Sequence, residues 1–244
     1  MERPRTAAVI PAFNEERTVS DVVRTVAGSG LFDEVIVVSD GSADRTAERA
    51  REAGATLVHE LPRNHGKGAA LAHGVMHTDA EVVCFFDSDL KGLTAEHVRL
   101  ILEPVTSGQR YMNVGLRDRG PFWTPLAMRL PLVGGERALR REIFDVIPER
   151  YLHRFKVETA LNYFCRANGL PYGLVVLPGL GIIRKMQKVG FWNGLKEYVI
   201  MWTEVAWAMV QVRLVRAQFR EMGQHMGHKH RAGRPPGEEE VPRT

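Results

Sequence analysis

The chain has 244 residues, and 44% of them are hydrophobic, which is enough for one large domain or for a domain with an appendage. Its net charge is only +4, but arginines crowd residues 110–154, a pattern that favours phosphate-bearing partners or a solvated basic face over general nucleic-acid binding. There is no signal-peptide core, no apolar run of roughly 20 residues and no disulfide framework or zinc spacing, and Cys84 and Cys165 have apolar surroundings, so we expect a cytoplasmic protein.

Apolar segments alternate with amphipathic ones through the first half of the chain. Continuous apolar strands separated by helices are typical of a parallel sheet that is covered on both faces. The sequence therefore predicts an α/β fold, with a first helix capped by Asn14 or Thr18 and a second helix that ends at Gly54. The expected strands are residues 7–10, 34–40, 55–61 and 81–89. The first expected helix ends at residues 28–30, and the next three span residues 42–54, 65–78 and 94–105.

The pattern is looser after Gly108. Prolines mark residues 120–135 as a long loop. The remaining expected elements are strands at 112–117 and 172–180, a helix at 151–168 that ends at Gly169, amphipathic helices at 192–222 and a disordered tail at 223–244.

Polar side chains follow four of the predicted strands at their carboxyl ends, where open α/β sheets bind ligands. Asp87 and Asp89 are two residues apart, so on an extended strand they share a face and their charges repel. A divalent cation removes this repulsion, and oxygen ligands suit Mg²⁺ or Mn²⁺, whereas a capped turn is the alternative interpretation. The other three strand ends carry Asn14 and Glu15, Asp40, and Lys67.

Four short motifs lie in order at these strand ends. They are VIPAFNEE at 9–16, VVSDGSADRT at 37–46, NHGKGAAL at 64–71 and FFDSDL at 85–90. Together they resemble the nucleotide-binding half of family 2 glycosyltransferases. The resemblance implies a GT-A fold, which is Rossmann-like, with a mostly parallel sheet flanked by helices and C-terminal amphipathic helices. It divides the chain into a domain at 1–190, with a nucleotide-sugar-binding half at 1–107 and an acceptor half at 108–190, a helical extension at 191–222 and a tail at 223–244.

The resemblance also implies the residues that bind a UDP- or GDP-sugar. The metal would bind Asp87 and Asp89, and Asp89 would take part in catalysis. Lys91 stands where dolichol-phosphate mannose synthases commonly have a glutamine, and GLGIIRK at 179–185 lacks a histidine that other branches have. The expected nucleotide-sugar-binding residues are Pro11, Ala12, Phe13, Asn14, Glu15, Asp40, Gly41, Lys67, Asp87, Ser88 and Lys91.

The second half of the chain should bind the acceptor. Its segments NVGLRDRG at 113–120 and PLAMRLPLVGGERALRREIF at 125–144 are similar to the acceptor region of polyprenyl-phosphate glycosyltransferases. In that family, paired arginines hold the acceptor phosphate, because guanidinium groups bind phosphate bidentately and stay charged. The arginines that match are Arg117, Arg129 and, in a later basic loop, Arg184.

The need for a general base depends on the acceptor. A phosphate acceptor is already ionised, whereas a hydroxyl acceptor needs a carboxylate to take its proton. Glu136 and Glu158 are the candidates; Glu136 lies in a segment similar to glucosyl-3-phosphoglycerate synthases, and an ion pair with an arginine is the alternative role for Glu158. We expect transfer to a polyprenyl phosphate. A small phosphorylated hydroxy compound such as phosphoglycerate is the alternative acceptor, and a non-catalytic nucleotide-sugar-binding protein is the alternative function.

The segment at 192–219 mixes tryptophan and aliphatic residues with charged ones. This composition suits a helix in the interface of a membrane, with the protein peripheral on the inner face. A helix that packs on the domain or in a homodimer interface has the same composition, so these interpretations stay open.

Overall fold

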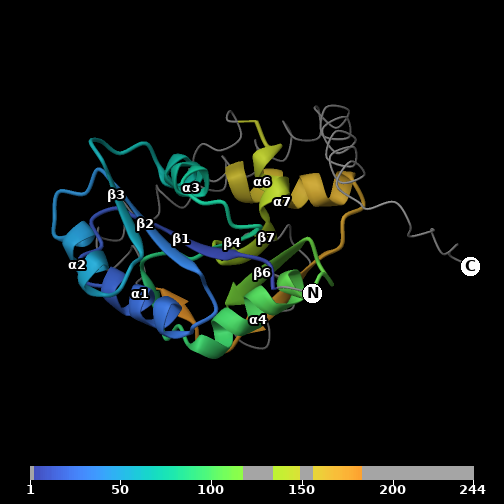
Figure 1. The fold of residues 1–244 in the computed structure, drawn as a ribbon, viewed down its shortest axis with the longest axis horizontal. Coiled ribbons are helices and arrows are strands. Elements are labelled where there is room, and N and C mark those ends of the chain that lie inside the picture. Colours follow the sequence, from blue (N-terminus) through green and yellow to red (C-terminus); the bar gives the residue numbers. More distant parts are fainter. Residues whose placement is uncertain (1–2, 118–133, 149–155, 183–244) are drawn as a thin grey trace, which may run out of the picture.

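Seven strands form one mixed sheet in the computed structural model, which describes residues 3–117, 134–148 and 156–182 (Figure 1). The first four strands in the chain run parallel to one another, as predicted. The order across the sheet is β3 (Leu57–Leu61), β2 (Glu34–Asp40), β1 (Thr6–Ala12), β4 (Val82–Phe85), β7 (Arg137–Arg140), β6 (Met112–Arg117) and β8 (Tyr172–Leu177). A small antiparallel ladder joins β5 (Leu90–Lys91) to β9 (Gly181–Ile182).

Helices cover both faces of the sheet (Figure 1). One face packs against α1 (Val19–Gly28), α2 (Thr46–Glu52) and α4 (Ala95–Thr106), and the other against α3 (Lys67–Met76), α6 (Arg141–Asp145) and α7 (Lys156–Ala167). Side chains alternate between the two cores along each strand: Ala8 and Ile10 of β1 lie in the core with α1, and Val9 lies in the core with α3. Strands β1, β2 and β4 are apolar on both faces for this reason, which is the pattern that predicted the fold.

The structure differs from the sequence prediction at several points. Strand β4 ends at Phe85, so the Asp87–Asp89 segment follows the strand and does not extend it. Thr18 precedes α1, but its side chain makes no capping hydrogen bond to the helix. Strand β7 was not predicted, and it runs antiparallel to both of its neighbours, β4 and β6. The short elements β5, β9 and α6 were not predicted either.

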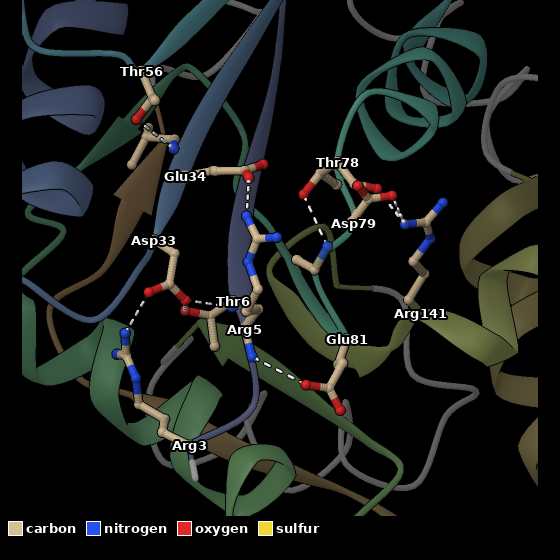
Figure 2. A network of polar contacts seen from close by, with 12 residues as sticks. Arg3, Arg5, Thr6, Asp33, Glu34, Thr56, Thr78, Asp79, Glu81 and Arg141 are labelled. Carbon is tan, nitrogen blue, oxygen red and sulfur yellow. Dashed lines mark hydrogen bonds and ion pairs between the residues drawn. The ribbon is translucent and has the colours of Figure 1, made fainter. Parts of the chain in front are cut away.

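The amino ends of the strands are fastened by ion pairs and hydrogen bonds (Figure 2). Arg3 and Arg5 pair with Asp33 and Glu34 at 2.6 and 2.8 Å, and the amide of Thr6 donates to Asp33 Oδ2 at 2.7 Å. This hydrogen bond from the Thr6 amide keeps the pKa of Asp33 below its usual value. The polar groups at this edge therefore bind one another.

Several predictions concern residues outside those that the structure describes. They include Arg129, Arg184, the extension at 191–222 and the tail, so the membrane surface, the homodimer and the domain boundaries stay predictions. Within the described ranges, no helix has both the length and the hydropathy needed to cross a bilayer. Cys84 and Cys165 are both buried free thiols, which confirms the prediction that they are core residues.

Candidate active site

The loop after β1 is fixed against the loop after β2. Asn14 has a φ of +54°, and its Oδ1 accepts from the amide of Ala43 at 2.8 Å. The amide of Glu15 donates to Thr46 Oγ1 at 2.8 Å. Pro11 and Ala12 are buried at the end of β1, whereas Phe13 is 47% exposed, so the loop presents an aromatic side chain beyond the sheet edge.

Asp40 is buried at the end of β2, where it fastens the loop that leads into α3. Its two carboxylate oxygens accept from the amides of His65 and Gly66 at 2.8 and 2.7 Å. Gly41 has a φ of +72°, and a Cβ there would lie 2.4 Å from the carbonyl carbon of Arg63, so this turn requires glycine. Asp40 thus positions the start of α3, and its predicted contact with a nucleoside stays a prediction.

Lys67 is the first residue of α3, and it lies between two carboxylates. Its Nζ is 2.7 Å from Asp87 Oδ1 and 3.1 Å from Glu158 Oε1. Burial by itself would lower the pKa of Lys67, but Asp87 and Glu158 outweigh this effect and raise it above its usual value. Lys67 is therefore not a solvated lysine, and within residues 3–117, 134–148 and 156–182 the ion-pair partner of Glu158 is this lysine and not an arginine.

Arg117, the last residue of β6, links Asp87 to a third carboxylate, that of Glu136. Its Nη2 donates to Glu136 Oε1 at 2.8 Å and to Asp87 Oδ2 at 3.3 Å. Burial and the neighbouring charge of Asp87 raise the pKa of Glu136, although Arg117 opposes this shift. The pKa of Asp87 is lowered: burial favours its neutral form, but Lys67 and then Arg117 stabilise its charged form more strongly.

Arg137 lies beside these charged side chains, and it was not among the site residues predicted from the sequence. It is fully buried on β7, and its guanidinium donates to the carbonyl oxygens of Gly134 and Glu158 at 2.5 and 3.3 Å. A third bond reaches Asn162 Oδ1 at 3.4 Å. The only sequence signal was the arginine-rich composition of the segment, because the antiparallel strand that buries Arg137 was not recognised.

Gly135 packs directly on the Lys67–Asp87 pair. A Cβ at this position would lie 2.5 Å from Asp87 Oδ2 and 2.8 Å from Lys67 Nζ. A side chain at position 135 would therefore push the two charged groups apart. Glycine is needed here for close approach, and the Gly-Gly pair in GGERAL was the sequence signal for it.

We name this group of side chains the charged cluster. Two of its carboxylate oxygens, Glu136 Oε2 and Glu158 Oε2, are buried without a hydrogen-bond partner in the described part of the chain. Unsatisfied buried oxygens are costly, so they are available to a ligand group or to a proton. The cluster consists of Lys67, Asp87, Arg117, Glu136, Arg137 and Glu158.

The DSD segment supplies oxygen ligands that suit a hard cation. Asp87 and Asp89 are partly buried on either side of Ser88, which is buried, and Lys91 is exposed on β5. Each Asp87 oxygen already faces a cation, and each keeps a second lone pair. An oxygen-only pair of carboxylates fits Mg²⁺ or Mn²⁺, with Asp87 held in place by Lys67 and Arg117.

The sequence matches the model of a known enzyme family. Residues 7–155 match the model of the glycosyl transferase family 2, which is more than half of the chain. The chain belongs to glycosyl transferase family 2. This family 2 match covers the loop after β1, the strand ends with Asp40 and Asp87, and the GGERAL segment of the charged cluster.

Curated relatives of this family 2 protein include synthases and lipid-phosphate transferases. The glucosyl-3-phosphoglycerate synthase of Mycolicibacterium paratuberculosis is 32% identical over 179 residues, which are 58% of this chain and 54% of that protein. The counterpart from Mycolicibacterium smegmatis is 42% identical over 92 residues, or 34% of this chain and 30% of that one. The undecaprenyl-phosphate 4-deoxy-4-formamido-L-arabinose transferase of Edwardsiella ictaluri is 34% identical over 126 residues, or 48% and 38%. The family 2 chain thus spans between about a third and about half of the length of these relatives.

Solved structures show the same fold over more of the family 2 chain. The glucosyl-3-phosphoglycerate synthase from Mycobacterium tuberculosis, in complex with Mn²⁺, UDP-glucose and phosphoglyceric acid, superposes with a TM-score of 0.71 at 26% identity. The match covers 86% of this chain and 79% of that one. A complex of that synthase with Mg²⁺ and UDP gives a TM-score of 0.64 at 28% identity, with 77% and 74% covered. These likenesses confirm the predicted GT-A-like fold.

Proposed function

We propose that the protein transfers a hexose from a nucleoside-diphosphate sugar to a small phosphorylated hydroxy acceptor such as phosphoglycerate. One observation supports this choice above the others: the fold matches, over 86% of the chain, a synthase whose structure holds UDP-glucose and phosphoglyceric acid. This acceptor was the alternative in the sequence interpretation. It now has better support than the polyprenyl phosphate that we expected first.

The donor would bind at the carboxyl edge of β1, β2 and β4. Phe13 and the Asn14 turn would face the nucleoside, and Asp87 and Asp89 would hold Mg²⁺ or Mn²⁺. Such an ion, when bound, neutralises the diphosphate that leaves as the bond to the sugar breaks. Lys67 already holds Asp87 at 2.7 Å, so in this proposal the lysine orients the metal-binding carboxylate and adds positive charge beside the diphosphate.

The acceptor would bind over the charged cluster. Arg117 carries the positive charge that a phosphate group needs, although its Nη2 is shared between Glu136 and Asp87. A hydroxyl acceptor also needs a base within hydrogen-bond reach. Glu158 and Glu136 each have a carboxylate oxygen without a partner among the described residues, which fits this requirement better than it fits a phosphate acceptor that is already ionised.

Transfer to a polyprenyl phosphate is the second candidate. The observation that favours it is the match to the undecaprenyl-phosphate transferase over 48% of this chain. Arg129 and Arg184, the other predicted acceptor-phosphate residues, have no structural description, so the two acceptors must be distinguished in solution.

A donor and acceptor screen tests the proposal. Radiolabelled UDP- and GDP-sugars would be incubated with the full chain, with Mg²⁺, Mn²⁺ or EDTA, and with 3-phosphoglycerate or a polyprenyl phosphate in detergent. We expect label in a water-soluble phosphorylated product, and none in the Asp89→Asn variant. Label in the lipid fraction would favour the second candidate, and nucleotide-sugar binding without transfer to any acceptor would indicate a non-catalytic binding protein.

A further inference from the structure

Three histidines gather at the far end of α3 from the charged cluster. His59 lies on β3, His73 lies on α3, and His77 follows α3 directly. Their ring centroids are 4.8 Å (His59–His73), 4.2 Å (His59–His77) and 4.4 Å (His73–His77) apart. One nitrogen from each ring lies within 4.8 Å of the other two. Residues four apart on a helix share a face, which is why His73 and His77 both meet the strand beside them.

The three rings offer nitrogen atoms that lie close together and can accept a metal ion. His77 Nδ1 lies 2.7 Å from the carbonyl oxygen of His73, and because a carbonyl only accepts, this nitrogen carries the proton and Nε2 has the lone pair. The Nε2 atoms of His59 and His73 are buried and have no hydrogen-bond partner in the described part of the chain. Two buried imidazole nitrogens that have no partner among the described residues are unfavourable unless something binds there.

Burial favours the neutral form of two of these rings, His59 and His73, and the geometry above brings them to His77. Burial lowers the pKa of both His59 and His73, and the nearby charge of His77 lowers each further. His77 is exposed, so solvent and ions can reach the cluster from its side. Its Nδ1–H bond to a backbone carbonyl is the type of outer-shell contact that commonly orients a metal-binding histidine.

We propose that His59, His73 and His77 form a binding site for Zn²⁺ or a similar borderline divalent transition metal. Imidazole nitrogens suit this class of ion, whereas Mg²⁺ requires oxygen ligands. Zinc–nitrogen bonds are about 2.0–2.1 Å long. The ring nitrogens would therefore move closer to one another than their present separation of up to 4.8 Å when the ion binds. Water on the exposed side would complete a four-coordinate site.

The site is separate from the carboxylate site proposed for Mg²⁺ or Mn²⁺. Ten positions separate Lys67 from His77, a distance of about 15 Å along a helix. A metal here would join β3 to α3, and α3 begins with the lysine that orients Asp87. The site thus fixes the element that carries Lys67, and its existence does not depend on which sugar or acceptor the protein uses.

Metal titration of the full chain, prepared without a histidine tag, tests the site. All proteins would carry glutamine at His225, His228 and His230, because tail histidines could also bind metal. Zn²⁺ binding would be measured by calorimetry, and Co²⁺ binding by its visible absorption, which is strong only for tetrahedral coordination. We expect one Zn²⁺ per chain and a tetrahedral Co²⁺ spectrum.

The variants separate this site from other metal-binding groups. His77 is exposed, so His77→Gln should leave the fold unchanged, and His65→Gln alters an exposed histidine outside the cluster as the matched control. We expect His77→Gln to weaken the affinity for Zn²⁺ by more than about 100-fold, because changes to residues that only contact a metal ligand already cost about 10- to 100-fold. We expect His65→Gln to leave the affinity for Zn²⁺ unchanged. The proposal is wrong if no Zn²⁺ binds, or if binding survives His77→Gln and is lost in Asp89→Asn. Because the readout is Zn²⁺ and Co²⁺ binding, its failure is distinct from failure of the glycosyl-transfer screen.

Discussion

Replacement of Lys67 by methionine removes the cation that Asp87 and Glu158 share. Methionine keeps much of the length and volume of the side chain, so the change isolates the charge. Asp87 keeps its contact with Arg117 at 3.3 Å, but Glu158, whose side chain is 7% exposed, loses the one hydrogen-bond partner its carboxylate has among the described residues. The variant therefore leaves one buried carboxylate without compensation.

The size of the effect follows from the geometry. At distances of 2.7 and 3.1 Å and an effective dielectric constant of about 20, each direct attraction is roughly 5–6 kcal/mol. Desolvation of the charges offsets most of this attraction, and removal of one partner of a buried pair costs about 3–5 kcal/mol. Because Asp87 retains Arg117, we expect the lower end, about 3 kcal/mol. For a chain of this size, that corresponds to a melting temperature lower by about 6–12 °C.

The assay is urea and thermal unfolding without nucleotide-sugar and with EDTA present. Arg24→Met is the matched control, because it removes an ion pair between side chains that are 63% and 77% exposed, and it should cost about 0.5 kcal/mol or less. In the double variant Lys67→Met, Glu158→Gln, the uncompensated charge is gone, so about 1–2 kcal/mol should return. A loss below about 1 kcal/mol in Lys67→Met, or no recovery in the double variant, would refute a buried charged cluster.

Two further predictions concern the same cluster. Gly135→Ala should separate Asp87 from Lys67 and lower transfer activity by about tenfold or more, because small misplacements at a catalytic centre are costly. Steady-state kinetics should show no such loss in Gly28→Ala, where a Cβ meets nothing within 4 Å. Equal activities of the two variants would contradict the packing argument. Burial raises the pKa of Glu136 above its usual value of 4.5 in the folded protein. As pH rises, the unfolded chain therefore loses this proton before the folded chain does. The free energy of unfolding should fall from pH 4.5 upward, until pH passes the raised pKa of the folded state. Urea unfolding across this range should show a smaller fall in Glu136→Gln, and parallel pH profiles would count against an acidic group in that environment.

Sequence patterns predicted the parallel half of the fold because the relevant information is local. Apolar strands that alternate with amphipathic helices fix which segments are buried on both faces, and the polar residues that end each strand must then meet at one edge. Asn14, Asp40 and Lys67 lie at that edge as predicted, and they are brought together by the hydrogen bonds between loops. The sequence alone could not say that Asp40 binds backbone amides, since its partners lie 25 residues away or more.

Only the tertiary structure decided the acceptor side and the histidine cluster. Strand β7 has four residues and lies between two strands that are distant in sequence, so no periodicity reveals it, yet its position buries Arg137 and brings Glu136 to Arg117. His59 on β3 meets His73 on α3 and His77 only in the folded structure, and no sequence pattern indicated this contact. The chain by itself thus determined the order of its elements and the edge where its polar groups collect. Which charges touch one another depended on contacts between remote segments, and these form only when the sheet and both helical layers pack together.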